Sequence, residues 1–198
     1  MAFLASDNTS GASVEIIEAI KRANESHAKS YGADHYTDRL TAKFREVFEH
    51  PELVVFPVFN GSAANCLSLA SIIRPYEAII AHQHSHLEND ECGMPEFLTG
   101  GKILKATGEN GKIDCARVQS IIALAKASGI HHSRPKAISI TQSTEFGTTY
   151  KTDEIAILSA LAKSNNLLLH MDGARFANAV AGLGHKPADI SWRAGVDV

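Results

Sequence analysis

The chain has 198 residues, of which 44% are hydrophobic and 21% charged, and its formal net charge is -3. This composition predicts an ordinary globular domain with one sizeable core and excludes a largely disordered chain. No block of Lys or Arg occurs, so we expect neither a nucleic-acid partner nor an anionic membrane surface. The expected partners are small molecules or other subunits.

The sequence pattern predicts two helices first and then an alternation of strands and helices. Ser13 opens an amphipathic helix of about three turns, and a second helix is expected over residues 37–49. Strands are then expected over residues 53–59, 78–82, 102–106, 137–141 and 167–171. Helices are expected over residues 63–73, 115–127, 153–164 and 174–183, with a short irregular helix near 86–97. Such alternation predicts an α/β fold with a mainly parallel sheet.

No linker, internal repeat or low-complexity tract divides the chain, so we expect one domain. Residues 195–198 have the pattern of an opening strand, and domains rarely end within a strand. The chain is therefore expected to be a fragment. Its three cysteines are widely spaced and odd in number, which indicates a reducing compartment. With no secretory signal and no run of ~20 apolar residues, a cytoplasmic protein without a membrane segment is expected.

Asp172 ends the apolar run Leu167-Leu168-Leu169-His170-Met171, and a helical pattern follows at once. Ligands of parallel sheets bind beyond the carboxyl ends of the strands, which places Asp172 at a candidate site. A buried carboxylate needs a cation or donors to compensate it. Asp172 could cap the following helix, or it could face a metal, a ribose hydroxyl or the protonated ring nitrogen of a cofactor.

A second motif, Asn60-Gly61-Ser62-Ala63, follows the expected strand 53–59. Small residues at a helix start leave free N–H groups that can hold a phosphate, although an ordinary strand-to-helix turn has the same appearance. Neither GxGxxG nor GxxxxGK[ST] occurs, which disfavours nucleotide binding.

The histidines of His82-Gln83-His84-Ser85-His86 alternate and could bind a catalytic zinc, with nearby carboxylates in support. They could equally be solvated or capping residues at a strand end. His86 has a further possible use as a flat ring stacked on a flat cofactor. We expect no metal here, and a zinc-dependent hydrolase that uses His82, His84 and His86 is kept as an alternative.

Asp172, Arg175, the Gly61-Ser62 turn and His86 together suit pyridoxal 5'-phosphate. This cofactor needs a carboxylate at its pyridine nitrogen, a turn for its phosphate, a ring against its face and an arginine for the amino-acid carboxylate. It also needs a lysine, and the lysines of this chain lie in surface-like patterns.

In order along the chain, several motifs closely resemble the low-specificity L-threonine aldolases. They are Ser6-Asp7-Asn8, Tyr31-Gly32-Ala33-Asp34, Pro57 to Asn65, Ser85-His86 with Glu91-Cys92-Gly93, and His170 to Arg175 with Asn178-Ala179. The resemblance implies a fold-type-I large domain, a three-layer α/β/α sandwich, that binds pyridoxal phosphate in a homo-oligomer, either a dimer or a tetramer. It also implies a retro-aldol reaction, in which L-threonine, L-allo-threonine or a related β-hydroxy-α-amino acid gives glycine and an aldehyde.

The resemblance also implies residue roles. Gly61, Ser62 and Ala63 would hold the phosphate, and Asp172 would pair with the pyridine nitrogen. His86 would stack on the ring and assist proton transfer. Ser6 and Arg175 would bind the substrate carboxylate, with Tyr31 near the site.

Two departures from the family pattern affect these expectations. Glu145 stands where well-known bacterial members have a second histidine, and it is a candidate replacement. The family's Schiff-base lysine follows the strand that residues 195–198 would begin, so this lysine and the small C-terminal domain are expected to be absent. We therefore expect the 198 residues to be inactive alone, and a truncated, non-catalytic protein of the same fold is the first alternative to the aldolase.

Overall fold

The computed structural model describes residues 9–198, so Ser6 lies outside the described residues. The chain divides into two compact units, Met1–Phe44 and Arg45–Val198. The described part of the first unit contains helix α1 (Val14–Ala23) and the start of helix α2 (His35–Val47). Helix α2 begins two residues before the predicted helix, because Asp34 Oδ1 accepts hydrogen bonds from the Tyr36 and Thr37 amides, both at 2.9 Å.

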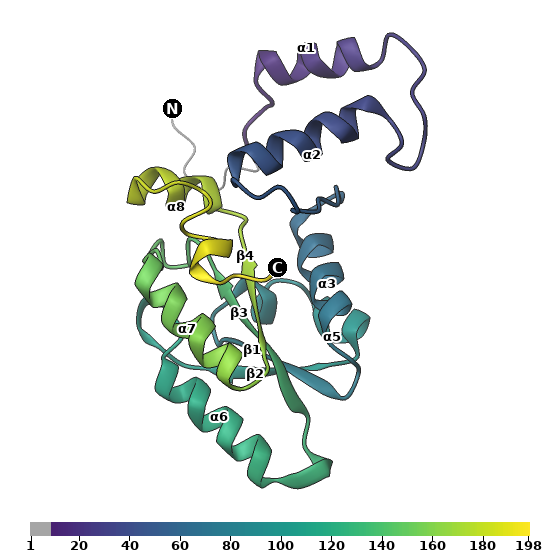
Figure 1. Cartoon of the computed structure of the whole chain (residues 1–198). Helices are drawn as coiled ribbons and strands as arrows, with labels where there is room; N and C mark the ends of the chain where they lie inside the picture. Colours follow the sequence, from purple (N-terminus) through teal and green to yellow (C-terminus); the bar gives the residue numbers. More distant parts are fainter. Residues whose placement is uncertain (1–8) are drawn as a thin grey trace. The chain divides into compact units, whose positions relative to one another are not determined.

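The second unit is built on one parallel sheet (Figure 1). Its strands are β1 (Glu77–His82), β2 (Lys102–Ala106), β3 (Arg134–Thr141) and β4 (Leu168–Asp172), in the order β2-β1-β3-β4. All three pairings are parallel. The predicted strand 102–106 is confirmed at both ends. The predicted strands 78–82, 137–141 and 167–171 are confirmed with ends that differ by a few residues.

Helices cover both faces of this sheet, which confirms the predicted three-layer α/β/α arrangement (Figure 1). Helices α6 (Cys115–Ala127) and α7 (Thr152–Ser164) pack on one face. Helix α3 (Gly61–Ile72), with the short helices α4 (His86–Asn89) and α5 (Met94–Thr99), lies on the other. Helix α8 (Phe176–Leu183) follows β4, and 3-10 turns occupy Glu109–Gly111, Gly129–His131 and Trp192–Ala194. No helix in the described residues is long and apolar enough to cross a membrane.

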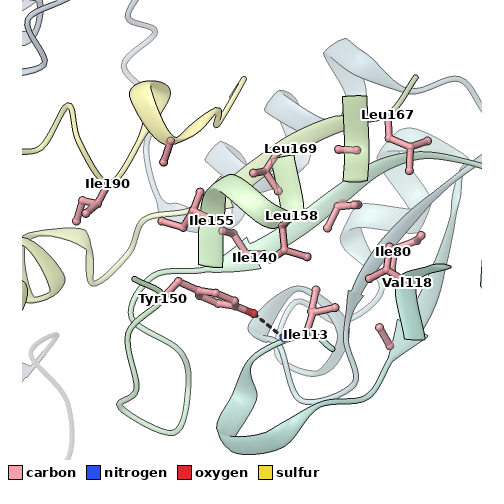
Figure 2. Close-up of a cluster of buried hydrophobic side chains, with 14 of the residues drawn as sticks. Ile80, Ile113, Val118, Ile140, Tyr150, Ile155, Leu158, Leu167, Leu169 and Ile190 are labelled. Carbon is pink, nitrogen blue, oxygen red and sulfur yellow. Dashed lines mark hydrogen bonds between the residues drawn. The ribbon is translucent and has the colours of Figure 1, made fainter. Parts of the chain in front are cut away.

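Successive residues of each strand point to opposite faces, so the sheet contributes to two cores. Ile80, Ile138 and Leu169 belong to the larger core, together with Val118 of α6 and Leu158 of α7 (Figure 2). The smaller core joins strand residues of the opposite face to α3 and α4. Its members are Leu69, Ile73, Ile79, Ala81, Leu87, Ile103 and Ala137.

Tyr150 gives the larger core one buried polar contact (Figure 2). Its hydroxyl oxygen accepts the amide N–H of Ile113 at 2.7 Å, and the side chain is 2% exposed. Burial raises the pKa of this phenol well above its usual range. We expect Tyr150→Phe to lower the free energy of unfolding by about 1–3 kcal/mol, because the Ile113 amide is left buried without an acceptor.

Urea unfolding of the wild type and Tyr150→Phe would measure this change. Tyr76→Phe provides the control, since the Tyr76 ring is 57% exposed and its hydroxyl contacts only the exposed Arg74. Equal unfolding free energies for wild type and Tyr150→Phe would contradict the expected role.

The predicted strand 53–59 is wrong, since these residues form no ladder. Pro57 has no N–H to donate, and the apolar side chains do not enter either core. Val54, Phe56 and Phe59 are 66%, 81% and 88% exposed. The apolar run that predicted a buried strand is thus an exposed, extended segment before α3.

Residues 195–198 are not assigned to a strand, although they run beside β4. The Asp197 amide donates to Leu169 O at 2.8 Å, and the Met171 amide donates to Val198 O at 2.8 Å. Asp197 Oδ2 also accepts the Leu169 amide at 2.8 Å. The strand-like pattern of this segment therefore corresponds to hydrogen bonding along β4.

Candidate active site

The candidate site lies at the carboxyl ends of the strands. The order β2-β1-β3-β4 means that the connections after β1 and β3 lead in opposite directions, which makes this edge a topological switch point. His86 follows β1, Glu145 follows β3 and Arg175 follows β4. A cavity of about 460 Å³ adjoins this edge, a size typical of small-molecule sites. It is lined by Val58, Asn60, Gly61, Ala64, Asn65, Ser68, His170, Met171, Asp172, Gly173, Ala174 and Val198.

Asp172 is buried at this cavity with 7% exposure. Its Oδ1 accepts the Ala174 amide at 3.0 Å, and its Oδ2 accepts Asn65 Nδ2 at 3.1 Å. The first contact is local but lies in the turn before α8, whose N-cap is Arg175, so Asp172 does not cap this helix as the capping alternative required. The second contact comes from α3. Both donors are neutral, so the described residues give this carboxylate hydrogen bonds but no cation in direct contact.

A second buried carboxylate, Glu91, lies beside it. Glu91 Oε1 accepts Asn65 Nδ2 at 2.8 Å and contacts His86 Nδ1 at 3.0 Å. The Cys66 thiol donates to Glu91 Oε2 at 3.7 Å. Burial, and then the charge of Glu91, raise the pKa of this thiol to about 11, so Cys66 remains a donor. Asn65 thus joins two carboxylates from distant parts of the chain.

One ring nitrogen of His86 and one oxygen each from Glu91 and Asp172 lie within 4.8 Å of one another. In the described part of the chain, this is the one group of three or more such residues with metal-ligand spacing. His82 and His84 do not belong to it. His82 contacts Gly108 O through Nε2 at 3.2 Å and the His84 amide through Nδ1 at 3.2 Å. His82 therefore makes structural contacts, and the three-histidine zinc cluster that the alternative hypothesis required does not form in the described residues.

The amino terminus of α3 opens onto the cavity. Asn60 caps this helix, because its Oδ1 accepts the Ala63 amide at 2.8 Å and its carbonyl oxygen accepts the Ala64 amide at 3.1 Å. Among the described residues, no acceptor contacts the Gly61 or Ser62 amide. A Cβ on Gly61 would meet nothing within 4 Å. The first turn therefore has room and two N–H groups for an anion.

Arg175 and Glu145 contact each other next to the His86 backbone. Arg175 Nε donates to Ser143 O at 3.1 Å, and Nη2 lies 3.5 Å from Glu145 Oε1. The same Glu145 oxygen accepts the His86 amide at 2.9 Å. Glu145 Oε2 is buried and has no hydrogen-bond partner in the described structure.

His170 lines the cavity and is held by two serine hydroxyls. It is 3% exposed, with Nδ1 2.9 Å from Ser139 Oγ and Nε2 3.0 Å from Ser68 Oγ. The Ser68 hydroxyl donates its hydrogen bond to Asn65 O at 3.0 Å. In the contact between Ser68 and His170, the donor is therefore the N–H at His170 Nε2. Burial lowers the pKa of His170 to about 4, against the opposing effect of Asp172. His170 is therefore a neutral histidine of β4 whose ring is hydrogen-bonded to Ser139 of β3 and Ser68 of α3.

The structure brings together most of the predicted site residues. Gly61 and Asp172 line the cavity, whereas His86 and Arg175 follow β1 and β4 at the same edge of the sheet without lining it. Ser62 and Ala63 follow in the first turn of α3 without lining the cavity. Tyr31 belongs to the first unit and its side chain is fully exposed, and its predicted substrate contact stays a prediction, as does that of Ser6.

Sequence reasoning gave no role to Asn65 or His170 as site residues. Asn65 is one helical turn after Gly61, and His170 precedes Asp172 by two positions, so it points to the same face of the sheet. The spacing of these residues, which places them on the same face as predicted site residues, could have identified them from the sequence. Nothing local in the sequence pairs Asn65 with Glu91, because the contact spans 26 residues.

A cavity at the switch point of a parallel sheet is typical of α/β proteins that bind small molecules. Sequence comparison gives the family: the chain belongs to the beta-eliminating lyases, whose family profile matches residues 4–198. The chain is 45% identical over 195 residues to a low specificity L-threonine aldolase of a Pseudomonas species. It is 46% identical over 195 residues to the enzyme of the same description from Pseudomonas aeruginosa.

Each of these alignments covers 98% of this chain and 56% of the relative, so the chain spans about half the length of the curated relatives that it matches. A solved threonine aldolase structure from Leishmania major superposes with a TM-score of 0.86 and 30% identity. That match covers 92% of this chain and 53% of the other. A tyrosine aminotransferase from Leishmania infantum, 14% identical with a TM-score of 0.55 over 79% of this chain and 42% of that one, shares the fold.

Proposed function

We propose that residues 1–198 form the pyridoxal-phosphate-binding large domain of an aldolase that cleaves L-threonine and related β-hydroxy-α-amino acids to glycine and an aldehyde. The observation that carries this proposal is the buried Asp172 carboxylate, which shares one cavity with the open amino terminus of α3. The family and the 45% identity to a low specificity L-threonine aldolase support the same activity.

The residues present fit this cofactor. The Gly61 and Ser62 amides, at the positive end of a 12-residue helix, suit its phosphate. Asp172 has only neutral donors around it and suits a protonated pyridine nitrogen, a pairing that cofactors of this kind require. When bound, pyridoxal phosphate supplies an electron sink for the charge left when the bond between the α and β carbons breaks.

The other side chains have separate tasks. The Arg175 guanidinium contacts Ser143 O and Glu145 on a side chain that is 39% exposed, and it suits the carboxylate of an amino acid. His86 offers an imidazole, a group that can act as a proton acceptor or donor. Glu145 Oε2, buried without a partner in the described structure, suits a hydroxyl or ammonium donor of the substrate.

One observation favours the alternative, a non-catalytic protein that binds the cofactor without turnover. Among the described residues that line the cavity, none is a lysine. A covalent link to the cofactor and an amine for proton transfer would then be missing, and their loss lowers rates by orders of magnitude.

A two-stage experiment tests these possibilities. Pyridoxal phosphate is titrated into the protein and followed by visible circular dichroism, with pyridoxal, which lacks the phosphate, as the matched control ligand. We expect saturable binding with one site per chain, and weaker binding of pyridoxal. L-threonine is then added and acetaldehyde is quantified, with L-valine, which is isosteric but lacks the hydroxyl, as the control substrate.

Acetaldehyde from threonine and none from valine would support the aldolase. Bound cofactor without acetaldehyde would favour the non-catalytic alternative. A protein that binds no pyridoxal phosphate at saturating concentration would contradict the cofactor site itself.

A homo-oligomer and a cytoplasmic location belong to the same proposal. The oligomer is supported by the exposed segment with Val54, Phe56 and Phe59, because apolar patches of this kind mark contact surfaces. Both remain predictions.

A further inference from the structure

We propose that Glu91 is a positioning residue that fixes the tautomer of His86, with the proton on Nδ1 and with Nε2 as the proton acceptor. This role rests on the proposed function, which gives the Nε2 atom its use. It assigns Glu91 and Asn65 a task in the reaction that the motif comparison did not give them.

The direction of each hydrogen bond follows from Asn65. Its side-chain nitrogen lies 2.8 Å from Glu91 Oε1 and 3.1 Å from Asp172 Oδ2. Both neighbours are carboxylate oxygens, so the NH2 end of the amide must face them. Glu91 Oε1 therefore acts as an acceptor, and the second group on this oxygen, His86 Nδ1 at 3.0 Å, must donate.

Burial makes Glu91 the fixed partner of this pair. Its side chain is 0% exposed, whereas that of His86 is 42% exposed. Glu91 is also held by Asn65 on one oxygen and by the Cys66 thiol on the other. The imidazole consequently takes its orientation from a carboxylate that cannot easily move.

The tautomer determines which atom can act as a base. A neutral imidazole has one N–H and one bare nitrogen. With Nδ1–H directed to Glu91, Nε2 is bare, and it has no hydrogen-bond partner in the described residues. Without the Glu91 acceptor, nothing in this set of contacts prevents the proton from moving to Nε2, where the ring could no longer accept one.

The test is a long-range ¹H–¹⁵N spectrum of ¹⁵N-histidine-labelled protein without cofactor, which distinguishes the two tautomers. The His86 signals are assigned by their loss in His86→Asn. Glu91→Gln keeps an oxygen acceptor for both neighbours, whereas Glu91→Leu removes it at similar volume. Glu88→Gln serves as the matched control, because Glu88 is on the same short helix as His86 but pairs with Lys105.

We expect the Nδ1–H form in wild type, Glu91→Gln and Glu88→Gln, and an increased Nε2–H population in Glu91→Leu. A wild-type protein in the Nε2–H form, or an unchanged tautomer in Glu91→Leu, would overturn the proposal. If Glu91→Leu does not fold, the wild-type and Glu91→Gln spectra still test whether His86 has the expected Nδ1–H form. The measurement needs neither cofactor nor turnover, so failure of the proposed function would be seen separately.

Affinity for pyridoxal phosphate provides a second readout. We expect the dissociation constant to rise about ten- to hundredfold in Glu91→Leu, by analogy with the loss of partners that orient metal-binding histidines, and to change little in Glu91→Gln. Equal weakening in both variants would indicate that the charge of Glu91, rather than its acceptor oxygen, is what matters, and would contradict the positioning role.

Discussion

Asp172→Asn is expected to weaken pyridoxal phosphate binding by about thirtyfold to several thousandfold. Removing one partner of a buried, hydrogen-bonded charge pair costs about 2–5 kcal/mol, and each 1.4 kcal/mol is a factor of ten. The asparagine keeps an oxygen that can accept the Ala174 amide, so the local turn after β4 is retained. It loses the negative charge that would face the pyridine nitrogen and also the oxygen that accepts Asn65 Nδ2.

Equilibrium dialysis of wild type and Asp172→Asn against pyridoxal phosphate would measure this difference. Asp114→Asn is the control: Asp114 caps α6 through the Ala116 amide, and asparagine caps helices equally well. Its affinity should equal that of the wild type. If Asp172→Asn bound the cofactor as tightly as the wild type while remaining folded, the buried carboxylate would not pair with the ring nitrogen.

His170 is expected to make the protein less stable as the pH falls from about 6.5 to about 4. Burial lowers the pKa of His170 to about 4, whereas a histidine in an unfolded chain titrates near ~6.5. Between these values the unfolded chain binds a proton that the folded protein does not. The contribution of His170 to the free energy of unfolding therefore does not change with pH above pH ~6.5. Below this pH it decreases, by on the order of 3 kcal/mol at pH ~4.

Urea unfolding at several pH values between 4 and 7 would show this dependence, and His170→Gln should flatten it. Other groups titrate in the same range, so the comparison is between slopes rather than absolute stabilities. His131→Gln, at an exposed position, controls for loss of an imidazole as such. A slope for His170→Gln that matches the wild type would show that the buried imidazole does not carry the effect.

The sequence predicted those parts of the fold that depend on local pattern. Strand 102–106 and helix 115–127 were predicted with their observed ends, since a short apolar run and an aspartate cap define them. The segment 53–59 failed because an apolar run does not specify what will cover it. A strand needs a neighbour to pair with, and this information lies outside the segment.

The candidate site was predictable to the extent that its residues follow strands. Asp172 is the last residue of β4, and Arg175 and His86 follow strands, so the topology brings all three to one edge of the sheet. The contacts among them were not predictable, because they depend on side chains that meet across the fold. Asn65 reaches Asp172 over 107 positions, and Glu145 reaches the His86 amide over 59.

This long separation in the chain also has a thermodynamic meaning. The pocket is assembled from α3 and the residue Val58 before it, from β4 and the residues after it, and from Val198, so no short stretch of the unfolded polypeptide contains it. A molecule that binds there interacts with the native state alone, and mass action then adds about 2.7 kcal/mol to the stability when its free concentration is a hundred times its dissociation constant. The vitamin-derived cofactor proposed for this cavity would accordingly protect the protein against heat and proteolysis whether or not any substrate is turned over.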